Sequence, residues 1–216
     1  MGALHAIINE MKKHFGLEIV RLLDIPCGDM QYMSHFLRMR TDIAYTGIDI
    51  FPDLIAHHRN TFKERPWIFR HADIVADDFI NEYDLIVSRY MLQHLENAAI
   101  FSIFKKISVE TKGPSFLLAT TSSNSQSNAD FNTNMRGRYR PVNVELAPFR
   151  LEPPLCMFRD GPIRSYRLTS FMGLWRLPIM TIPESICKPV RFSTALSQRP
   201  IYSCVNWNSK TNSRYN

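Results

Sequence analysis

The chain has 216 residues, 45% of them hydrophobic and 21% charged, which suits a single domain with a substantial core. It contains no run of 18 apolar residues, and Lys12 and Lys13 interrupt the first apolar segment, so we expect neither a transmembrane helix nor a signal peptide. The net charge of +6 is uneven, because residues 136–216 hold 13 Lys and Arg against 4 Asp and Glu. We expect scattered surface arginines there rather than a face for nucleic acid or membrane, since they do not cluster at helical spacing.

The four cysteines are widely spaced, and no pair has the spacing of a zinc or redox site. They are Cys27, Cys156, Cys187 and Cys204. We therefore expect free thiols in a reducing compartment, a cytoplasmic protein and no metal centre.

Apolar periodicity predicts strands and helices that alternate over the first 121 residues. This order predicts a parallel sheet with helices on both faces, and right-handed connections bring the carboxyl ends of the strands to one edge. The predicted helices cover residues 3–15, 30–39, 53–61 and 97–108, and the predicted strands cover 17–25, 45–49, 67–71, 83–88 and 115–121.

The pattern changes after residue 121. A Ser- and Asn-rich stretch at 122–134 predicts a long loop, either disordered or a lid, and an extended segment follows at 138–149. Two short apolar pieces, 155–158 and 171–177, are candidates for final strands added antiparallel to the sheet.

A tight turn follows the first predicted strand and has the features of a nucleotide site. Asp24 ends the strand, Pro26 and Cys27 form the turn, and Gly28 lets the backbone approach a ligand without a Cβ atom. The second strand ends in Asp49, whose carboxylate can accept hydrogen bonds from ribose hydroxyls. Acids at both strand ends favour a ligand with hydroxyls and an amine over a ligand with a pyrophosphate. S-adenosylmethionine has these groups, and we assign Asp24 to the amine of its methionine part.

Residues after the second and third strands complete this predicted cofactor site. Asp73 can accept from the adenine amino group, with Ile74 packed on the ring, although Asp73 can also be an ordinary loop acid. Ile50, which follows Asp49, is assigned to the same site. Asp29 is equally compatible with a cofactor contact and with the start of a helix, where negative charge suits the dipole.

The segment after the fourth strand is where a methyl group should meet its acceptor. Ser88 and Arg89 are assigned to the cofactor, while Arg89 can instead bind an acidic substrate or form a salt bridge. Tyr90 is assigned to the substrate. His94 is the candidate catalytic base because its usual pKa lies near neutrality, and the alternative is a histidine that only holds the loop.

Arg140 and Asn143 are polar residues among apolar neighbours in the extended segment. We assign them to the substrate as a pair that lines a pocket. The alternative is the ordinary polarity of an edge strand.

These motifs together resemble class I S-adenosylmethionine-dependent methyltransferases. The resemblance rests on residues 23–29, 45–50, 83–89 and 92–95, and it covers roughly residues 17–178. It implies an α/β Rossmann-like three-layer sandwich with a mostly parallel seven-stranded sheet and an antiparallel C-terminal hairpin.

More narrowly, the chain resembles a mainly bacterial group of these enzymes. The shared features are the Asp-x-Pro-Cys-Gly-Asp turn, the Arg-Pro-x-Asn segment at 140–143 with Pro-Phe at 148–149, and Gly-Leu-Trp-Arg-Leu at 173–177. Members often carry Asp after the Arg of the fourth motif, and this chain has Tyr90 there. We expect a methyltransferase domain over residues 1–178 and a partly disordered appendage over 179–216.

The resemblance implies S-adenosyl-L-methionine as cofactor and methyl transfer to a small-molecule, sugar or glycan acceptor. One alternative is a catalytically inactive methyltransferase-fold protein that acts as a binding module, which Tyr90 and the short N-terminal segment favour. Another is an RNA methyltransferase that uses the basic C-terminal half. The oligomeric state stays open.

Overall fold

A computed structural model describes residues 2–77, 83–110, 115–131, 139–160 and 170–177. Its centre is a seven-stranded sheet in the order β3-β2-β1-β4-β5-β7-β6. The first five strands run parallel, and β7 runs antiparallel to both β5 and β6. The sandwich predicted from the sequence is thus confirmed. The strands are β1 (Val20–Asp24), β2 (Ile43–Asp49), β3 (Ile68–His71), β4 (Leu85–Ser88), β5 (Ser115–Thr121), β6 (Cys156–Asp160) and β7 (Ser170–Leu177).

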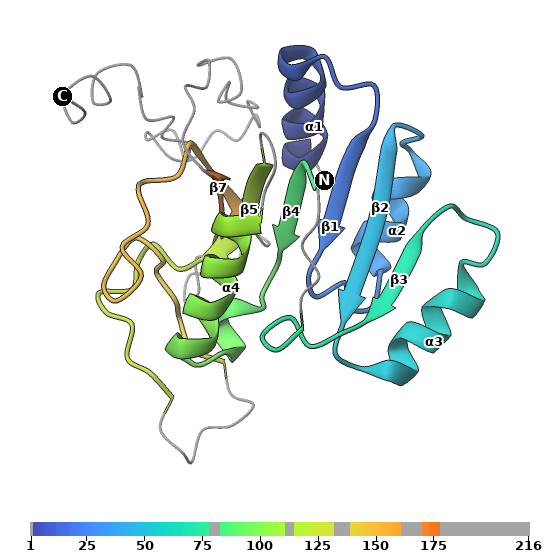
Figure 1. The fold of residues 1–216 in the computed structure, drawn as a ribbon. Helices are drawn as coiled ribbons and strands as arrows, with labels where there is room; N and C mark the ends of the chain where they lie inside the picture. Colours follow the sequence, from blue (N-terminus) through green and yellow to red (C-terminus); the bar gives the residue numbers. More distant parts are fainter. Residues whose placement is uncertain (1, 78–82, 111–114, 132–138, 161–169, 178–216) are drawn as a thin grey trace, which may run out of the picture.

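Helices cover both faces of the sheet (Figure 1). Alternate strand residues point to opposite faces, so Leu22 and Leu85 pack with three helices and Leu23 and Ile86 pack with the fourth. The first face carries α1 (Gly2–Phe15), α2 (Gln31–Arg38) and α3 (Pro52–Thr61), and the second carries α4 (Asn97–Glu110), which follows the short 3₁₀ helix η1 (Leu92–His94).

Helix α1 has the apolar face that its sequence predicts. Leu4, Ile7, Ile8 and Met11 recur at helical spacing and are buried against the sheet. The helix gives way to a left-handed Gly16 (φ +66°), and β1 begins only at Val20, three residues later than predicted. The apolar residues between them lie in the connection, which the strand periodicity alone does not distinguish from the strand.

The segments that follow β5 are ordered over their described parts. Residues 122–131 pack against residues 139–149, and Ser122 donates its backbone N–H to the Val142 carbonyl at 2.7 Å. Disorder is therefore not a property of 122–131. The predicted appendage at 179–216 lies outside the described residues.

The two described cysteines differ. Cys27 is a buried free thiol, as predicted. Cys156 is disulfide-bonded, so the prediction of free thiols is wrong there, and its partner lies outside the described residues. The cytoplasmic location, which rested partly on free thiols, stays a prediction. Within the described part of the chain, no helix has the length and apolar character needed to cross a bilayer.

Gly47 determines how closely β2 approaches the turn after β1. It pairs with Asp24 in the parallel register, and a Cβ atom built on it would lie 2.7 Å from the Tyr45 hydroxyl and 2.8 Å from the Cys27 Cβ. Both neighbours are buried and cannot easily move. Glycine is therefore required at this position by close packing and not by an unusual backbone angle.

We expect Gly47→Ala to lower the free energy of unfolding by about 1–3 kcal/mol, because the added methyl overpacks a closed region. Chemical denaturation measures this change, with Ala44→Ser on the exposed side of the same strand as a control. Equal stabilities of the two variants would contradict the packing argument.

Candidate functional site

The turn between β1 and α2 is built on the ends of three neighbouring strands. Asp24 ends β1, and the Ile25–Pro26 peptide bond that follows is cis. Ile25 donates its N–H to the Val87 carbonyl of β4 at 2.8 Å, and Cys27 donates to the Ile48 carbonyl of β2 at 2.9 Å. The turn is thus held from both sides at the carboxyl edge of the sheet, where open α/β folds bind ligands.

Asp49 fastens the same turn to the end of β2. The Gly28 N–H donates to Asp49 Oδ2 at 3.1 Å, and the Phe51 N–H donates to Oδ1 at 3.2 Å. Gly28 has φ +53°, a left-handed conformation that glycine adopts without a Cβ penalty. Asp49 therefore shapes the turn and still has carboxylate lone pairs available for a ligand.

His58 of α3 holds the other side of Gly28. Its Nε2 lies 2.7 Å from the Gly28 carbonyl oxygen, and the ring is buried. Because a carbonyl only accepts, Nε2 carries the proton. The Nδ1 atom is buried and has no hydrogen-bond partner among the described residues.

The Asp24 carboxylate is buried beneath the turn, with Tyr45 as its hydrogen-bond donor. The Tyr45 hydroxyl donates to Asp24 Oδ2 at 3.0 Å. No described basic side chain forms an ion pair with Asp24. Burial raises the pKa of Asp24 to about 7, and the nearby Asp49 adds to the increase, while Tyr45 and Arg89 oppose it.

A cavity of about 200 Å³ opens beside Asp24. Asp24, Cys27 and Gly28 line one part of it. The rest of the lining is mainly apolar and aromatic, including Tyr32, Tyr90 and Phe158, and its charged members are Asp29, Arg89 and Asp160. The cavity therefore joins a buried acid to a space suited to an apolar ligand.

Arg89 and Asp160 form an ion pair across this cavity. Arg89 Nε and Nη2 donate to the two Asp160 oxygens, both at 2.9 Å. The guanidinium carbon lies 5.1 Å from the Tyr32 ring centre and 5.2 Å from that of Tyr90. The charge of Arg89 is thus largely matched by Asp160 and by two aromatic faces.

Tyr90 has an unusual backbone. Its φ is +57°, which is a rare conformation for a bulky residue, and its N–H donates to Thr120 Oγ1 at 3.1 Å. Such outliers gather at functional sites, where the surrounding structure maintains them.

The remaining predicted cofactor residues lie along the same edge and, like Asp49 and Pro26, are not part of the cavity lining. Ile50 is 53% exposed next to Asp49, and Ser88 is buried at the end of β4. Asp73 Oδ1 accepts the Val75 N–H at 2.8 Å, and Ile74 is partly buried. Their assignment to the cofactor stays a prediction.

His94 lies in η1, and its side chain is exposed. Its ring lies edge-on to that of Tyr139, with 5.9 Å between ring centres. It does not line the cavity beside Asp24. A catalytic role for His94 therefore stays a prediction that this geometry does not favour over a loop residue.

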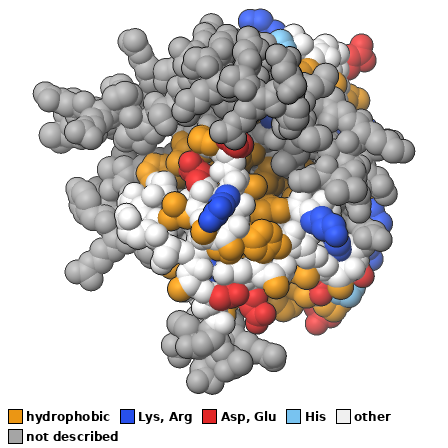
Figure 2. All heavy atoms as spheres, turned by 60° about the vertical axis from the view of Figure 1, so that its left-hand side comes forward, with side chains coloured by type: hydrophobic (Ala, Val, Ile, Leu, Met, Phe, Trp, Pro, Cys, Tyr) orange, Lys and Arg blue, Asp and Glu red, His pale blue; other side chains and the backbone are white. Residues whose placement is uncertain are grey.

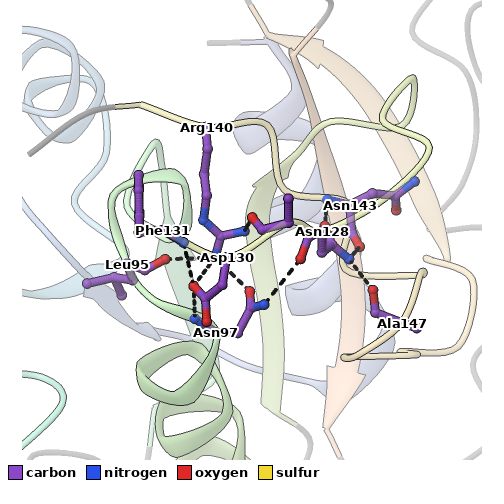
Figure 3. Close-up of polar contacts among 9 residues, drawn as sticks. Leu95, Asn97, Asn128, Asp130, Phe131, Arg140, Asn143 and Ala147 are labelled. Carbon is purple, nitrogen blue, oxygen red and sulfur yellow. Dashed lines mark hydrogen bonds and ion pairs between the residues drawn. The ribbon is translucent and has the colours of Figure 1, made fainter. Parts of the chain in front are cut away.

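Arg140 is buried in a network away from the cavity (Figure 3). It donates to the Leu95 carbonyl at 2.8 Å, to Asn97 Oδ1 at 2.7 Å and to the Ala129 carbonyl at 3.2 Å. Its carboxylate neighbour Asp130 lies 3.9 Å away. Arg140 thus connects the start of α4 to the loop after β5.

Asn143 belongs to the same network through Asn128. Its backbone N–H donates to Asn128 Oδ1 at 2.8 Å, and Asn128 Nδ2 donates back to the Asn143 carbonyl at 2.7 Å (Figure 3). The Asn143 side chain accepts the Glu145 N–H at 3.1 Å. Like Arg140, it is occupied by protein partners and does not line the cavity beside Asp24.

The face that carries α4 and the segment after β5 is turned forward in Figure 2. Among the described residues, its Lys and Arg side chains stand apart from one another between hydrophobic ones. No continuous basic stripe forms in this described part.

Several residues at the site were not identified from the sequence. Tyr32 belongs to no motif, and Tyr45 begins the 45–50 motif but was given no role. Asp160 lies 71 positions from Arg89, its partner in the ion pair. Alternation along β2 places Tyr45 on the same face as the buried apolar residues, which was the available signal. Only folding brings Asp160 to Arg89.

Comparison with known proteins agrees with this geometry. Residues 23–109 match a family described as a methyltransferase domain, and no curated protein matches the sequence. The N-methyltransferase NodS from Bradyrhizobium japonicum, solved with S-adenosyl-L-homocysteine, is similar at a TM-score of 0.59 and 14% identity, over 82% of this chain and 86% of that chain.

Two further solved structures share the fold. The 1,6-didemethyltoxoflavin-N1-methyltransferase from Burkholderia thailandensis has a TM-score of 0.58 and 17% identity, over 81% of this chain and 78% of that chain. PigF, solved with SAH, has a TM-score of 0.53 and 14% identity over 78% of this chain, which spans about half (53%) of PigF.

The sheet order and these likenesses define the class: the protein has the Rossmann-like α/β fold of class I methyltransferases. Within it, residues 23–109 carry the sequence pattern of a methyltransferase domain, and they include Asp24, Gly28, Asp49 and Arg89.

We expect Asp24→Asn to stabilise the protein at high pH. The folded chain holds the Asp24 proton up to about pH 7, whereas an unfolded chain releases it near its ordinary value of 3.8, so stability falls as pH rises between these values. The variant loses this penalty and should exceed the wild-type free energy of unfolding by on the order of 2 kcal/mol at pH 8.

Thermal unfolding at pH 4.5 and pH 8 measures the difference, with the exposed Asp53→Asn as control. If the stability difference between variant and wild type were similar at both pH values, the pKa of Asp24 would not be raised in the folded protein.

We expect Arg140→Ala to lower the free energy of unfolding by about 2–4 kcal/mol, because the three hydrogen bonds that this buried side chain donates are lost. Denaturant titration measures it, and Arg38→Ala on the exposed side of α2 should change stability by less than about 0.5 kcal/mol. Equal effects would argue against a structural network around Arg140.

Proposed function

We propose that the protein is an S-adenosyl-L-methionine-dependent methyltransferase that acts on a small-molecule acceptor. The proposal depends on one observation: the Asp24 carboxylate is buried, lines a cavity and has no ion-pair partner among the described residues. A buried acid of this kind is costly unless a cationic ligand group binds it. The family match over residues 23–109 adds independent support.

The residues present fit this cofactor. Asp24 would accept from its amine, and Gly28, which has no side chain, would let the backbone approach it. Asp49 would accept from the ribose hydroxyls with the lone pairs that Gly28 and Phe51 leave available. Two carboxylates at neighbouring strand ends therefore support a ligand that carries an amine and hydroxyls.

Further contacts are proposed from the order of the strand ends. Asp73 and Ile74 would meet the adenine, since they follow β3, with Ile50 beside them. Pro26, Cys27 and Ser88 would form the surface beneath the methionine part, and Arg89 would lie beyond it. Asp73 has one carboxylate oxygen without a described partner, which is compatible with this role.

The acceptor would occupy the apolar part of the cavity. When bound, S-adenosylmethionine supplies an electrophilic methyl group, so this chain's residues need mainly to align the acceptor and to exclude water. Tyr90 and Tyr32 line that part, and the paired Arg89 and Asp160 leave little net charge there. This supports an uncharged, ring-bearing or partly apolar acceptor more than a heavily hydroxylated sugar.

Proton transfer is needed only if the attacking atom carries a proton at working pH. His94 remains the base predicted from the sequence, although it is exposed and outside the cavity lining. We further propose that the chain belongs to the mainly bacterial group with the Asp-x-Pro-Cys-Gly-Asp turn.

We expect Asp49→Ala to weaken binding of S-adenosylhomocysteine at least tenfold, because it removes the ribose acceptor and the bond that shapes the Gly28 turn. Isothermal titration calorimetry measures this affinity. Asp53→Ala, four residues further along and exposed, is the matched control.

Each outcome separates the alternatives. If titration of S-adenosylhomocysteine into the wild-type protein gave no heat of binding, the proposed function would be overturned. Binding without methyl transfer to any acceptor would favour the inactive binding module, and unchanged affinity in Asp49→Ala would overturn the site.

A further inference from the structure

We propose that Tyr45 is a positioning residue, which holds the Asp24 carboxylate toward the cofactor's amine and sets the pH range over which that carboxylate is charged. This inference rests on the proposed function, because it assigns the amine of the cofactor to Asp24. Tyr45 itself does not line the cavity and touches the ligand only through Asp24.

Tyr45 reaches Asp24 from inside the protein. Its side chain is 1% exposed on β2, and its ring packs edge-on against Trp67 and Phe69 at centre distances of 6.3 and 5.9 Å. The ring therefore has no freedom to turn away. Gly47 leaves the space that the hydroxyl needs.

The hydroxyl has two partners at equal distance. It lies 3.0 Å from Asp24 Oδ2 and 3.0 Å from the Met30 sulfur. It has one proton, so it can donate to only one of them at a time. The arrangement consequently has two hydrogen-bonded forms.

When Asp24 is charged, Tyr45 donates its proton to the carboxylate. When Asp24 is neutral, its own proton can be donated to the Tyr45 oxygen, and the Tyr45 proton turns to the Met30 sulfur, which is a weak acceptor. Neither form leaves the carboxyl without a partner. The charged form has the stronger bond, so Tyr45 favours it.

Other charged groups around Asp24 act in both directions. Arg89, from the segment after β4, favours the charged carboxylate, whereas Asp49 at the end of β2 opposes it. Tyr32 of α2 and Cys27 of the turn also face this region, and burial raises the pKa of both, so they stay neutral. Burial and the Asp24 charge likewise raise the pKa of Tyr45, which keeps it a proton donor.

Tyr45→Phe tests this role because it removes the hydroxyl and keeps the ring. Wild-type affinity for S-adenosylhomocysteine should fall as pH drops below about 7, where Asp24 takes up a proton. Without its donor, Asp24 should become charged about one pH unit higher. The variant should then bind about tenfold more weakly at pH 6, with the difference closing by pH 8.5.

Calorimetric titration of the full-length protein between pH 5.5 and 8.5 measures both profiles. Tyr83→Phe makes the same chemical change in a residue that packs on the face of the sheet covered by α4, and it should follow the wild-type profile. A loss in Tyr45→Phe that is constant over pH would mean a merely structural role and would overturn the inference. Absence of binding by the wild-type protein at every pH would instead overturn the proposed function.

Discussion

The burial of one acidic side chain at the end of the central strand is the constraint on which this structure depends. Asp24 lies among three strand ends and a helix, and nothing in the described residues neutralises it by an ion pair. Burial disfavours its charged form. Around this group lie the turn, Tyr45, Met30 and Gly47. The packing of these residues therefore also determines the chemistry of the site. A protein selected for stability alone would gain from replacing the acid.

The same turn shows how a small number of backbone hydrogen bonds can define a binding surface. Asp49 and His58 hold the N–H and the carbonyl of Gly28 from opposite sides. The glycine can therefore keep a left-handed conformation without relying on its own flexibility. The rigid turn leaves a carboxylate and an open backbone beside a cavity, which is the preorganised arrangement that ligand binding favours.

The polar residues after β5 have hydrogen-bond partners within the protein, and their assignment to the substrate stays a prediction. Asn128 and Asn143 hydrogen-bond each other, and Arg140 donates to Asn97 and to the backbone of neighbouring loops (Figure 3). Buried polar residues need partners, and the protein supplies them here. Polarity amid apolar neighbours is thus equally compatible with a pocket and with an internal network, and sequence alone does not separate the two.

The sequence by itself determined the alternation of strands and helices and the acids at the strand ends. Periodicity reports local burial, and the ends of parallel strands must share an edge, so Asp24 and Asp49 could be placed together from their positions. The tertiary structure alone decided that Tyr45 lies under Asp24, that Asp160 pairs with Arg89 and that Arg140 is enclosed. These contacts join residues 21, 71 and 45 positions apart, and no local pattern encodes which distant side chains will meet. The ionisation of Asp24 depends on those neighbours, so it too is a property of the fold.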